Sequence, residues 1–185
     1  MQDAANSTRC PWCGPDPLYQ AYHDREWGRP EHDAIRLFEL LMLESFQAGL
    51  SWITILRKRE AFRAAFAGFD PATLATWGEP EVARLLADAG IVRHRGKIEG
   101  TIRGAQAFLR IEAREGFSPF LWSFAPPPGP RPATMAEVPA QTLQSQAMSR
   151  ALKAEGFAFV GPTITYAFMQ ASGMVNDHIA TCDWG

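Results

Sequence analysis

Two pairs of potential metal ligands lie near opposite ends of this 185-residue chain. Cys10 and His23 are close to the start, and His178 and Cys182 are close to the end. If the segment 178–182 is helical, its two ligands lie one turn apart on one face, which suits two corners of a tetrahedral zinc site. A metal held by all four would join the ends of the chain and close a long loop. The alternative is that the four residues are unrelated polar or buried side chains.

Cys13 offers a second way to complete such a site. Cys10 and Cys13 have the C-x-x-C spacing of many zinc sites, so Cys13 could replace His23 as a ligand. The chain has three cysteines, an odd count, and no signal-peptide pattern at its start. Both features favour reduced thiols or metal thiolates over disulfides, and we expect the protein to be cytoplasmic.

The composition is that of an ordinary globular protein. Hydrophobic residues make up 46% of the chain and charged residues 21%, and the net charge is −2. Without a run of about 18 apolar residues, no membrane span is expected. We predict a polar, loose tail over residues 1–9 and one domain over residues 10–185, acting as a monomer.

The basic residues are clustered although the net charge is slightly negative. One cluster spans residues 57–59, and another contains Arg93, Arg95 and Lys97. Such a cluster can grip phosphates, because that needs only local positive charge. A solvated helix face or turn explains it equally well.

The hydrophobic periodicity is helical almost throughout, so the predicted fold class is all-α. No alternating strand pattern of useful length occurs, and the proline-rich stretch 125–132 is expected to be a peripheral loop. The expected helices span residues 33–47, 51–67, 80–89, 95–114, 118–122, 145–154 and 163–172, and Asp70-Pro71 is expected to start another helix as its N-cap and first residue.

The last two expected helices are joined by a short turn that contains glycine. Gly161 and Thr163 lie where the second helix begins, and exposed amides at a helix start can bind a DNA phosphate. This arrangement, over about residues 145–173, has the physics of a helix-hairpin-helix. Many ordinary helix pairs are also joined by such a turn.

Several aromatic residues are not spaced as core residues are. Trp12, Tyr22 and Trp27 fall in segments expected to be loops, and Trp52 lies at a helix junction. Aromatic side chains at such places can line a pocket that stacks a flat ligand, and a nucleobase is flat. The alternative for each of them is packing at the edge of the core.

Glu44 stands inside the apolar stretch 40–46. A carboxylate is costly there unless it has a partner, so it either points into a cavity or faces solvent. Apolar neighbours on most sides favour the cavity.

Five segments of the sequence together resemble the 3-methyladenine DNA glycosylase I (Tag) family. The similarity runs in order from about Cys10 to Cys182, and its most specific block is Leu43 to Trp52. The other segments are His23 to Gly28, Arg93 to Ile98, Leu121 to Phe124, and Phe159 to Thr163 continuing through Asn176-Asp177-His178.

The resemblance implies a helix-hairpin-helix protein that flips 3-methyladenine out of alkylated double-stranded DNA, hydrolyses its N-glycosidic bond and releases the free base. It makes Glu44 the catalytic residue that accepts hydrogen bonds from the base. Tyr22 and Trp52 would be stacking walls with the cationic base between them, flanked by Trp12 and Trp27. Arg93, Arg95, Lys97, Gly161 and Thr163 would contact DNA.

The resemblance also implies one structural zinc ion held by Cys10, His23, His178 and Cys182, with Cys13 left as a free thiol. Four protein ligands leave no open position for catalysis.

Two features limit the mechanism. Asn176 falls where many helix-hairpin-helix glycosylases have a catalytic aspartate, with Asp177 one residue further on, so an aspartate-assisted reaction is in doubt. No lysine follows the hairpin, which predicts a monofunctional enzyme without lyase activity. A DNA-binding module without chemistry, or a relative adapted to another alkylated purine, are the alternatives.

Overall fold

The computed structural model describes residues 8–185, and the regular elements within that range are all helical. The predicted all-α class is therefore confirmed. None of these helices is long and apolar enough to cross a membrane. The α-helices are α1 (Pro17–Arg25), α2 (Ala34–Gln47), α3 (Trp52–Ala65), α4 (Pro71–Leu74), α5 (Glu79–Ala87), α6 (Arg95–Arg114), α7 (Phe117–Trp122), α8 (Leu143–Glu155) and α9 (Pro162–Ala171), with short 3-10 turns at Pro11–Cys13, Ala67–Phe69 and Met135–Glu137.

Helix α1 corrects one expectation, because Tyr22 lies on this helix and not in a loop. Asp16 caps the helix by accepting hydrogen bonds from the amides of Leu18 and Tyr19, and Pro17 occupies its first position. An aspartate followed by proline starts α4 in the same way at residues 70–71. The same signal was therefore present for α1.

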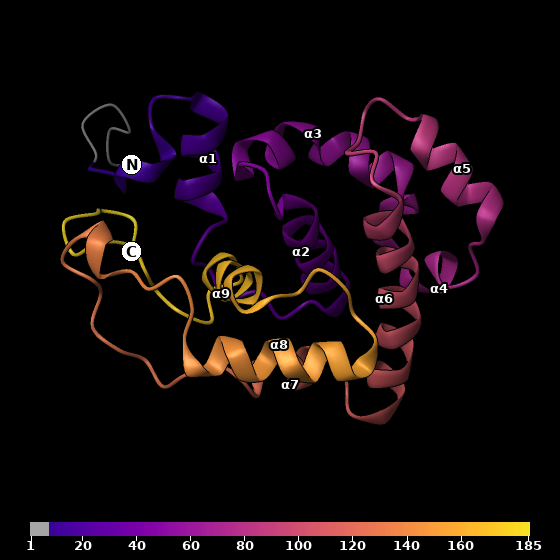
Figure 1. Cartoon of the computed structure of the whole chain (residues 1–185). Coiled ribbons are helices and arrows are strands. Elements are labelled where there is room, and N and C mark those ends of the chain that lie inside the picture. The colour runs from indigo at the N-terminus through magenta and orange to yellow at the C-terminus, as the bar shows by residue number, and fades with distance from the viewer. Residues whose placement is uncertain (1–7) are drawn as a thin grey trace.

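Helix α2 is the centre of the fold. It packs against α3, α6, α7 and α9, and Figure 1 shows α2 and α9 in the middle of the molecule with other helices around them. The eight residues that α2 buries include Glu44 and its neighbours Leu43 and Phe46. A side chain on so enclosed a helix has a fixed position, which suits a residue that must meet a ligand.

The start of the described part of the chain and its C-terminal segment lie together at one side of the molecule (Figure 1). The amide of Thr8 donates to Asp183 Oδ2 at 2.7 Å, and the amide of Asp183 donates to the Thr8 carbonyl at 3.0 Å. Within the predicted loose tail, Thr8 thus contacts the C-terminal segment, and residues 1–7 lie outside the described residues. These contacts bring Cys10 next to the C-terminal segment that contains His178 and Cys182.

The segment 178–182 is not helical, which corrects the basis on which its two ligands were paired. Helix α9 ends at Ala171, and the chain continues in turns and irregular structure. The amide of Cys182 donates to the carbonyl of Ile179 at 2.8 Å, so a tight turn brings the two ligands together instead of a helix.

Candidate functional site

A cavity of about 310 Å³ lies between the N-terminal helices and α9. This volume is at the small end of typical ligand sites. Its walls come from four parts of the chain, which contribute Trp12, Tyr19, Tyr22 and Trp27, then Glu44, Gln47 and Trp52, then Met135, Val138, Pro139 and Ala140, and finally Thr163, Tyr166, Ala167, Gln170 and Asp177.

Glu44 reaches this cavity from α2, as the sequence predicted. Its side chain is 3% exposed, and its Oε2 has no hydrogen-bond partner among the described residues. Burial raises the pKa of Glu44 to about 8, because the charged form loses its hydration. Burial therefore favours the neutral carboxyl group, whose Oε2 is available to a ligand in the cavity.

All four predicted aromatic residues line the cavity. The rings of Tyr22 and Trp52 have centroids 5.5 Å apart and planes inclined at 45°. The rings of Trp12 and Trp27 meet edge to face at 4.9 Å. A flat base placed between two parallel rings would need them about 7 Å apart, twice the usual contact distance. Tyr22 and Trp52 therefore lie closer together than that in this structure, and both line the cavity.

Asp177 gives the cavity a second carboxylate, which the sequence analysis did not place there. Its Oδ2 accepts hydrogen bonds from the Tyr166 hydroxyl at 2.6 Å and from Gln170 Nε2 at 2.8 Å. Asn176 is exposed, and its Oδ1 accepts from the amide of His178 at 3.2 Å. The carboxylate at the pocket is therefore that of Asp177, the residue after Asn176, and the α9 side chains Tyr166 and Gln170 hold it in place.

Other cavity residues were missed for different reasons. Tyr19 lies three positions before Tyr22 on α1, so a helix expectation there would have found it. Gln47 follows Glu44 by three positions on α2 in the same way. The loop residues from Met135 to Ala140 have no periodic pattern, and only the tertiary structure brings them to the cavity.

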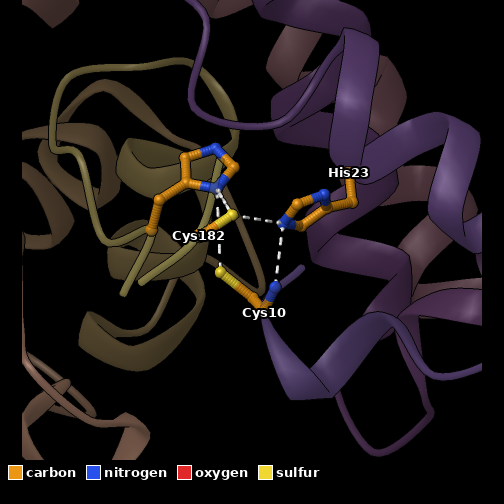
Figure 2. Close-up of side chains that lie close together, drawn as sticks. Cys10, His23 and Cys182 are labelled. Carbon is orange, nitrogen blue, oxygen red and sulfur yellow. Dashed lines mark hydrogen bonds between the residues drawn. The ribbon is translucent and has the colours of Figure 1, made fainter. Parts of the chain in front are cut away.

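A second site is formed where the chain ends meet. Cys10, His23, His178 and Cys182 are all buried, and their ligand atoms lie within 4.8 Å of one another. Figure 2 shows Cys10, His23 and Cys182 converging on a common point. Cys13 is not a member of this cluster, because its thiol donates to the Cys10 carbonyl at 3.2 Å. Of the two ligand sets open from the sequence, the structure thus assembles the one with His23.

The cluster has dimensions that suit a tetrahedral metal ion. The Sγ of Cys182 is 3.5 Å from His23 Nε2 and 3.4 Å from His178 Nδ1, and the Sγ of Cys10 is 3.7 Å from His178 Nδ1. Zinc bond lengths of about 2.3 Å to sulfur and 2.0–2.1 Å to nitrogen place tetrahedral S and N ligands about 3.6 Å apart. The four residues therefore fit a metal ion.

The outer nitrogens of both histidines are oriented by acceptors. His23 Nδ1 lies 2.8 Å from Asp24 Oδ1, and the Asp24 carboxylate also accepts two-pronged hydrogen bonds from Arg9 at 2.9 and 2.8 Å. His178 Nε2 lies 3.3 Å from the carbonyl of Trp27. Such contacts turn the lone pairs of the inner nitrogens toward the cluster, as in known metal sites.

The protonation of the cluster is consistent with a metal site. Burial raises the pKa of Cys10 to about 12 and lowers the pKa of His178 to about 4. The imidazole of His178 is therefore neutral at pH 7, as a ligand must be. A metal would displace the thiol proton of Cys10 as it bound.

Arg131 holds the C-terminal part of this cluster in place. Its guanidinium donates to the carbonyls of His178, Ile179, Cys182 and Gly185. The contact with the His178 carbonyl is 3.1 Å long. The amide of Ala180 also donates to the carbonyl of Pro132, the residue after Arg131, at 2.8 Å. The proline-rich loop is thus not peripheral, because it carries Arg131, which binds the turn that contains His178 and Cys182.

Lys97 corrects one of the DNA-binding expectations. Its side chain is 6% exposed, and Nζ donates to the carbonyl oxygens of Phe46 at 2.9 Å and Ala48 at 2.7 Å. Those carbonyls form the end of α2. A lysine bound in this way does not reach a phosphate, because its donors point into the protein.

The other DNA-binding candidates differ in their surroundings. Arg93 is exposed, whereas Arg95 forms ion pairs with Glu79 at 2.9 Å and Glu99 at 3.3 Å. Thr163 lies in the first turn of α9 and lines the cavity, and Gly161 is the residue that caps this helix. The start of α9 therefore lies at the cavity itself.

The all-helical fold and a cavity with a buried carboxyl group among aromatic walls suit a class of protein that binds a flat ligand able to form hydrogen bonds. Comparison with known proteins narrows that class. A family model described as methyladenine glycosylase matches residues 12–184. The chain therefore belongs to the methyladenine glycosylase family.

Individual relatives agree over nearly the whole chain. DNA-3-methyladenine glycosylase 1 of Escherichia coli (strain K12) is 54% identical over 177 residues, covering 94% of this chain and 95% of its own. A crystal structure of 3-methyladenine DNA glycosylase I (TAG) has a TM-score of 0.93 at 52% identity, covering 95% and 98%. A variant of such an enzyme, in complex with 3-methyladenine, has a TM-score of 0.91 at 37% identity, covering 95% and 96%.

Proposed function

We propose that this protein is a DNA glycosylase that removes 3-methyladenine from alkylated double-stranded DNA, the first step of base excision repair. One observation carries the proposal, namely the buried carboxyl group of Glu44 with an unpartnered oxygen in an aromatic pocket. Phosphate binding alone needs no such group, which argues against a DNA-binding module without chemistry. Family membership and the relative bound to 3-methyladenine support the same substrate.

The chemistry of the lesion explains why few catalytic groups suffice. Methylation at N3 makes the base cationic, so it leaves the sugar readily as a neutral molecule. The bond between C1′ and N9 breaks with its electron pair going to N9, and a water oxygen adds to C1′ while its proton is released. The protein must extrude, select and orient the base, because the bond is inaccessible within the stacked duplex.

The pocket residues contact the base in two ways, through aromatic faces and through the carboxyl group of Glu44. Tyr22 and Trp52 present aromatic faces to the cationic base, each face contributing about 0.5–2 kcal/mol when desolvated. Trp12 and Trp27 extend the aromatic surface. Glu44 accepts a hydrogen bond from the base edge and ionises when the cation enters, because a positive charge nearby lowers the pKa of a carboxyl group.

Asp177 contributes negative charge beside the bond that breaks. Tyr166 and Gln170 fix its carboxylate, so it can stabilise positive charge that develops on the sugar without rearranging. No lysine lines the pocket within residues 8–185, so the chain offers no amine there for a Schiff base with the sugar. We propose on this ground a monofunctional enzyme without lyase activity.

The cysteine and histidine cluster holds one structural zinc ion per chain. Cys10, His23, His178 and Cys182 fill all four positions of a tetrahedral ion. When bound, the ion supplies a cross-link between the two ends of the chain. Reducing conditions in the cytoplasm keep its cysteines available, and we place the enzyme there as a monomer.

The helix-hairpin-helix formed by α8 and α9 grips the DNA backbone. Amides around Gly161 and Thr163 point out from the start of α9, where the first N–H groups have no partner within the helix. Exposed Arg93 adds positive charge nearby on the chain before α6, and Arg95 does so once it exchanges its carboxylate partners for phosphate. Because the start of α9 lies at the cavity, DNA bound there has its backbone next to the cavity.

Release of bases from one preparation of methylated DNA tests the function. The wild-type protein is expected to release 3-methyladenine in preference to 7-methylguanine, measured by chromatography of the freed bases. Glu44→Gln and Trp52→Ala are expected to lower kcat/KM by about 10²–10³-fold with an unchanged helical spectrum. Wild-type rates in both variants would show that the pocket is assigned wrongly, and equal release of both bases would indicate an enzyme adapted to several alkylated purines.

A further inference from the structure

Lys97 lies where two functional parts of the molecule meet, although it reaches neither the cavity nor the surface. Its Nζ donates to the carbonyls of Phe46 and Ala48, in the last turn of α2 and directly after it. The last carbonyls of a helix lack partners within the helix and carry partial negative charge, so a buried ammonium group binds them strongly. Lys97 therefore fixes where α2 ends.

The end of α2 is also a part of the pocket. Glu44 and Gln47 line the cavity from the last turn of α2, and Trp52 lines it from the first position of α3. The two helices are joined by residues 48–51 alone. A hydrogen bond to the first residue of this turn consequently sets the position of the carboxyl group and of the tryptophan together.

The opposite side of Lys97 faces the turn between α8 and α9. Its Nζ lies 5.8 Å from the ring centroid of Phe159, within the range of a cation–π contact. Phe159 has a positive φ of 57°, so this turn has a conformation that non-glycine residues rarely adopt. A Cβ built on Gly96 would be 3.4 Å from the Phe159 ring, and one on Gly100 would be 3.7 Å from it. The ring thus lies against α6 where that helix has no side chains.

Lys97 is therefore shared by the turn that carries Glu44 and Trp52 and by the hairpin that starts α9. In Figure 1 the α8–α9 connection passes beside α6 on its way to the centre of the fold. We propose that Lys97 is a positioning residue, which holds the α2–α3 turn and the α8–α9 hairpin at a fixed separation so that a base extruded from hairpin-bound DNA meets Glu44 and Trp52. This inference rests on the proposed function. It assigns Lys97 a role in the turnover of duplex DNA, in addition to its hydrogen bonds to the end of α2.

Lys58 provides a matched control for this idea, because its ammonium group, like that of Lys97, is bound to main-chain carbonyls and not presented to a phosphate by the basic cluster 57–59. Its Nζ also donates to two main-chain carbonyls, those of Ala89 at 3.1 Å and Gly90 at 3.0 Å, in the connection between α5 and α6. Neither Lys58 nor these carbonyl residues lines the cavity. Lys58→Met and Lys97→Met therefore remove the same kind of contact, and only the second lies between the pocket and the hairpin.

The test compares turnover of methylated duplex DNA with binding of free 3-methyladenine, measured by tryptophan fluorescence. K97M is expected to lower kcat/KM on DNA by about tenfold or more, because a displacement of about 1 Å in a catalytic group can cost 10²-fold. Its affinity for the free base is expected to stay within about threefold of wild type, since Glu44 and Trp52 move together with the α2–α3 turn and keep their places relative to each other, and a small ligand need not be positioned by the hairpin. K58M is expected to keep the wild-type kcat/KM within about twofold, whatever stability it loses.

The conservative variant Lys97→Arg keeps the cation and its donors and is expected to restore most of the activity. Equal kcat/KM for K97M and K58M would overturn the positioning role, as would a parallel loss of free-base affinity in K97M. If K97M does not fold, Lys97→Gln serves in its place, and a wild-type kcat/KM in K97Q would overturn the role. Failure of the wild-type protein to release 3-methyladenine would instead refute the proposed function.

Discussion

Tyr22 and Asp177 both line the pocket, and each is followed directly in the chain by a histidine of the buried cluster. The pairs Tyr22-His23 and Asp177-His178 come from opposite ends of the sequence. Each histidine can move only slightly without moving its neighbour, since one peptide unit joins them. The cluster therefore fixes one wall and one carboxylate of the pocket at the same time.

Metal removal is predicted to lower stability and free-base affinity together. Protein purified without chelator is expected to contain one zinc ion per chain by elemental analysis. Extraction of the ion should lower the melting temperature by about 10 °C or more, since structural zinc binding is worth several kcal/mol. It should also weaken binding of 3-methyladenine, because Tyr22 and Asp177 lose their anchors.

Cys13→Ser is the control for this experiment, since Cys13 lies beside the cluster without belonging to it. This variant is expected to retain the metal, whereas Cys182→Ser is expected to lose it. Absence of zinc from the native protein, or equal loss of metal in the two variants, would contradict the assignment.

Removing Arg131 is predicted to loosen the turn that carries His178 and Cys182. Arg131→Ala loses hydrogen bonds to four carbonyls, so the free energy of unfolding should fall by about 2–4 kcal/mol. Zinc should also pass to a competing chelator faster than from the wild type. Arg131→Lys is expected to rescue little, since a lysine cannot reproduce the forked set of donors.

Exposed Arg150 on α8 offers a control with the same change of charge. Arg150→Ala should leave both the melting curve and the rate of zinc release unchanged. The role of Arg131 would be refuted if the two alanine variants released zinc at the same rate.

The E44Q variant is predicted to be more stable than the wild type, by a free energy of unfolding that grows as pH rises. The pKa of Glu44 is about 8 in the folded protein and has its ordinary value of 4.5 in the unfolded chain, so the folded protein binds the proton more tightly. Its contribution to stability is complete below about pH 4.5 and is lost as pH rises toward 8, by about 1.4 kcal/mol per unit. Glutamine does not titrate and avoids this loss.

Urea unfolding of both proteins at several pH values between about 5 and 8 measures the difference. The advantage of E44Q should grow with pH, to about 3–4 kcal/mol as an order of magnitude. The metal site is common to both proteins, so its own pH dependence cancels in the comparison. A difference that does not change with pH would mean that Glu44 has a carboxyl pKa near the ordinary value.

The sequence predicted the helices and the members of the buried cysteine and histidine cluster better than it predicted the surroundings of charged side chains. Helical periodicity and Asp-Pro starts are local signals, and α1 was missed only because the signal at Asp16 was not used. Lys97 belonged to a basic cluster and resembled a DNA contact. Its ammonium group turns inward because it donates to the carbonyl of Ala48 at the end of α2, 49 positions earlier, and the local sequence does not show that contact.

Two further differences have the same physical origin. The ligands His178 and Cys182 were expected on a helix, yet a turn held by Arg131 brings them together. Asn176 was matched to an aspartate by position, whereas the direction of a side chain in irregular backbone depends on tertiary contacts. Tyr166 and Gln170 draw Asp177 into the cavity, and sequence spacing does not encode that contact.

Asp177→Asn is predicted to slow the chemical step more than it weakens binding. Asparagine keeps an oxygen that accepts from Tyr166 and Gln170 but removes the negative charge. The value of kcat should fall by about 10–100-fold, while the affinity for free 3-methyladenine stays within about threefold. Tyr166→Phe, which keeps the charge and loses one hydrogen bond, should have the smaller effect on kcat. A larger loss in Y166F than in D177N would assign Asp177 a structural role.

The pH dependence of turnover tests how Glu44 is used. Below its pKa of about 8 the carboxyl group is neutral in the free protein, and it must lose a proton to pair with the cationic base. The value of kcat/KM on methylated duplex DNA should therefore rise with pH, by up to tenfold per unit, and level off near pH 8. E44Q has no such group, so its much lower activity should lack this rise. A wild-type profile that falls over the same range would mean that the protonated carboxyl group is the active form, donating its hydrogen to the departing base.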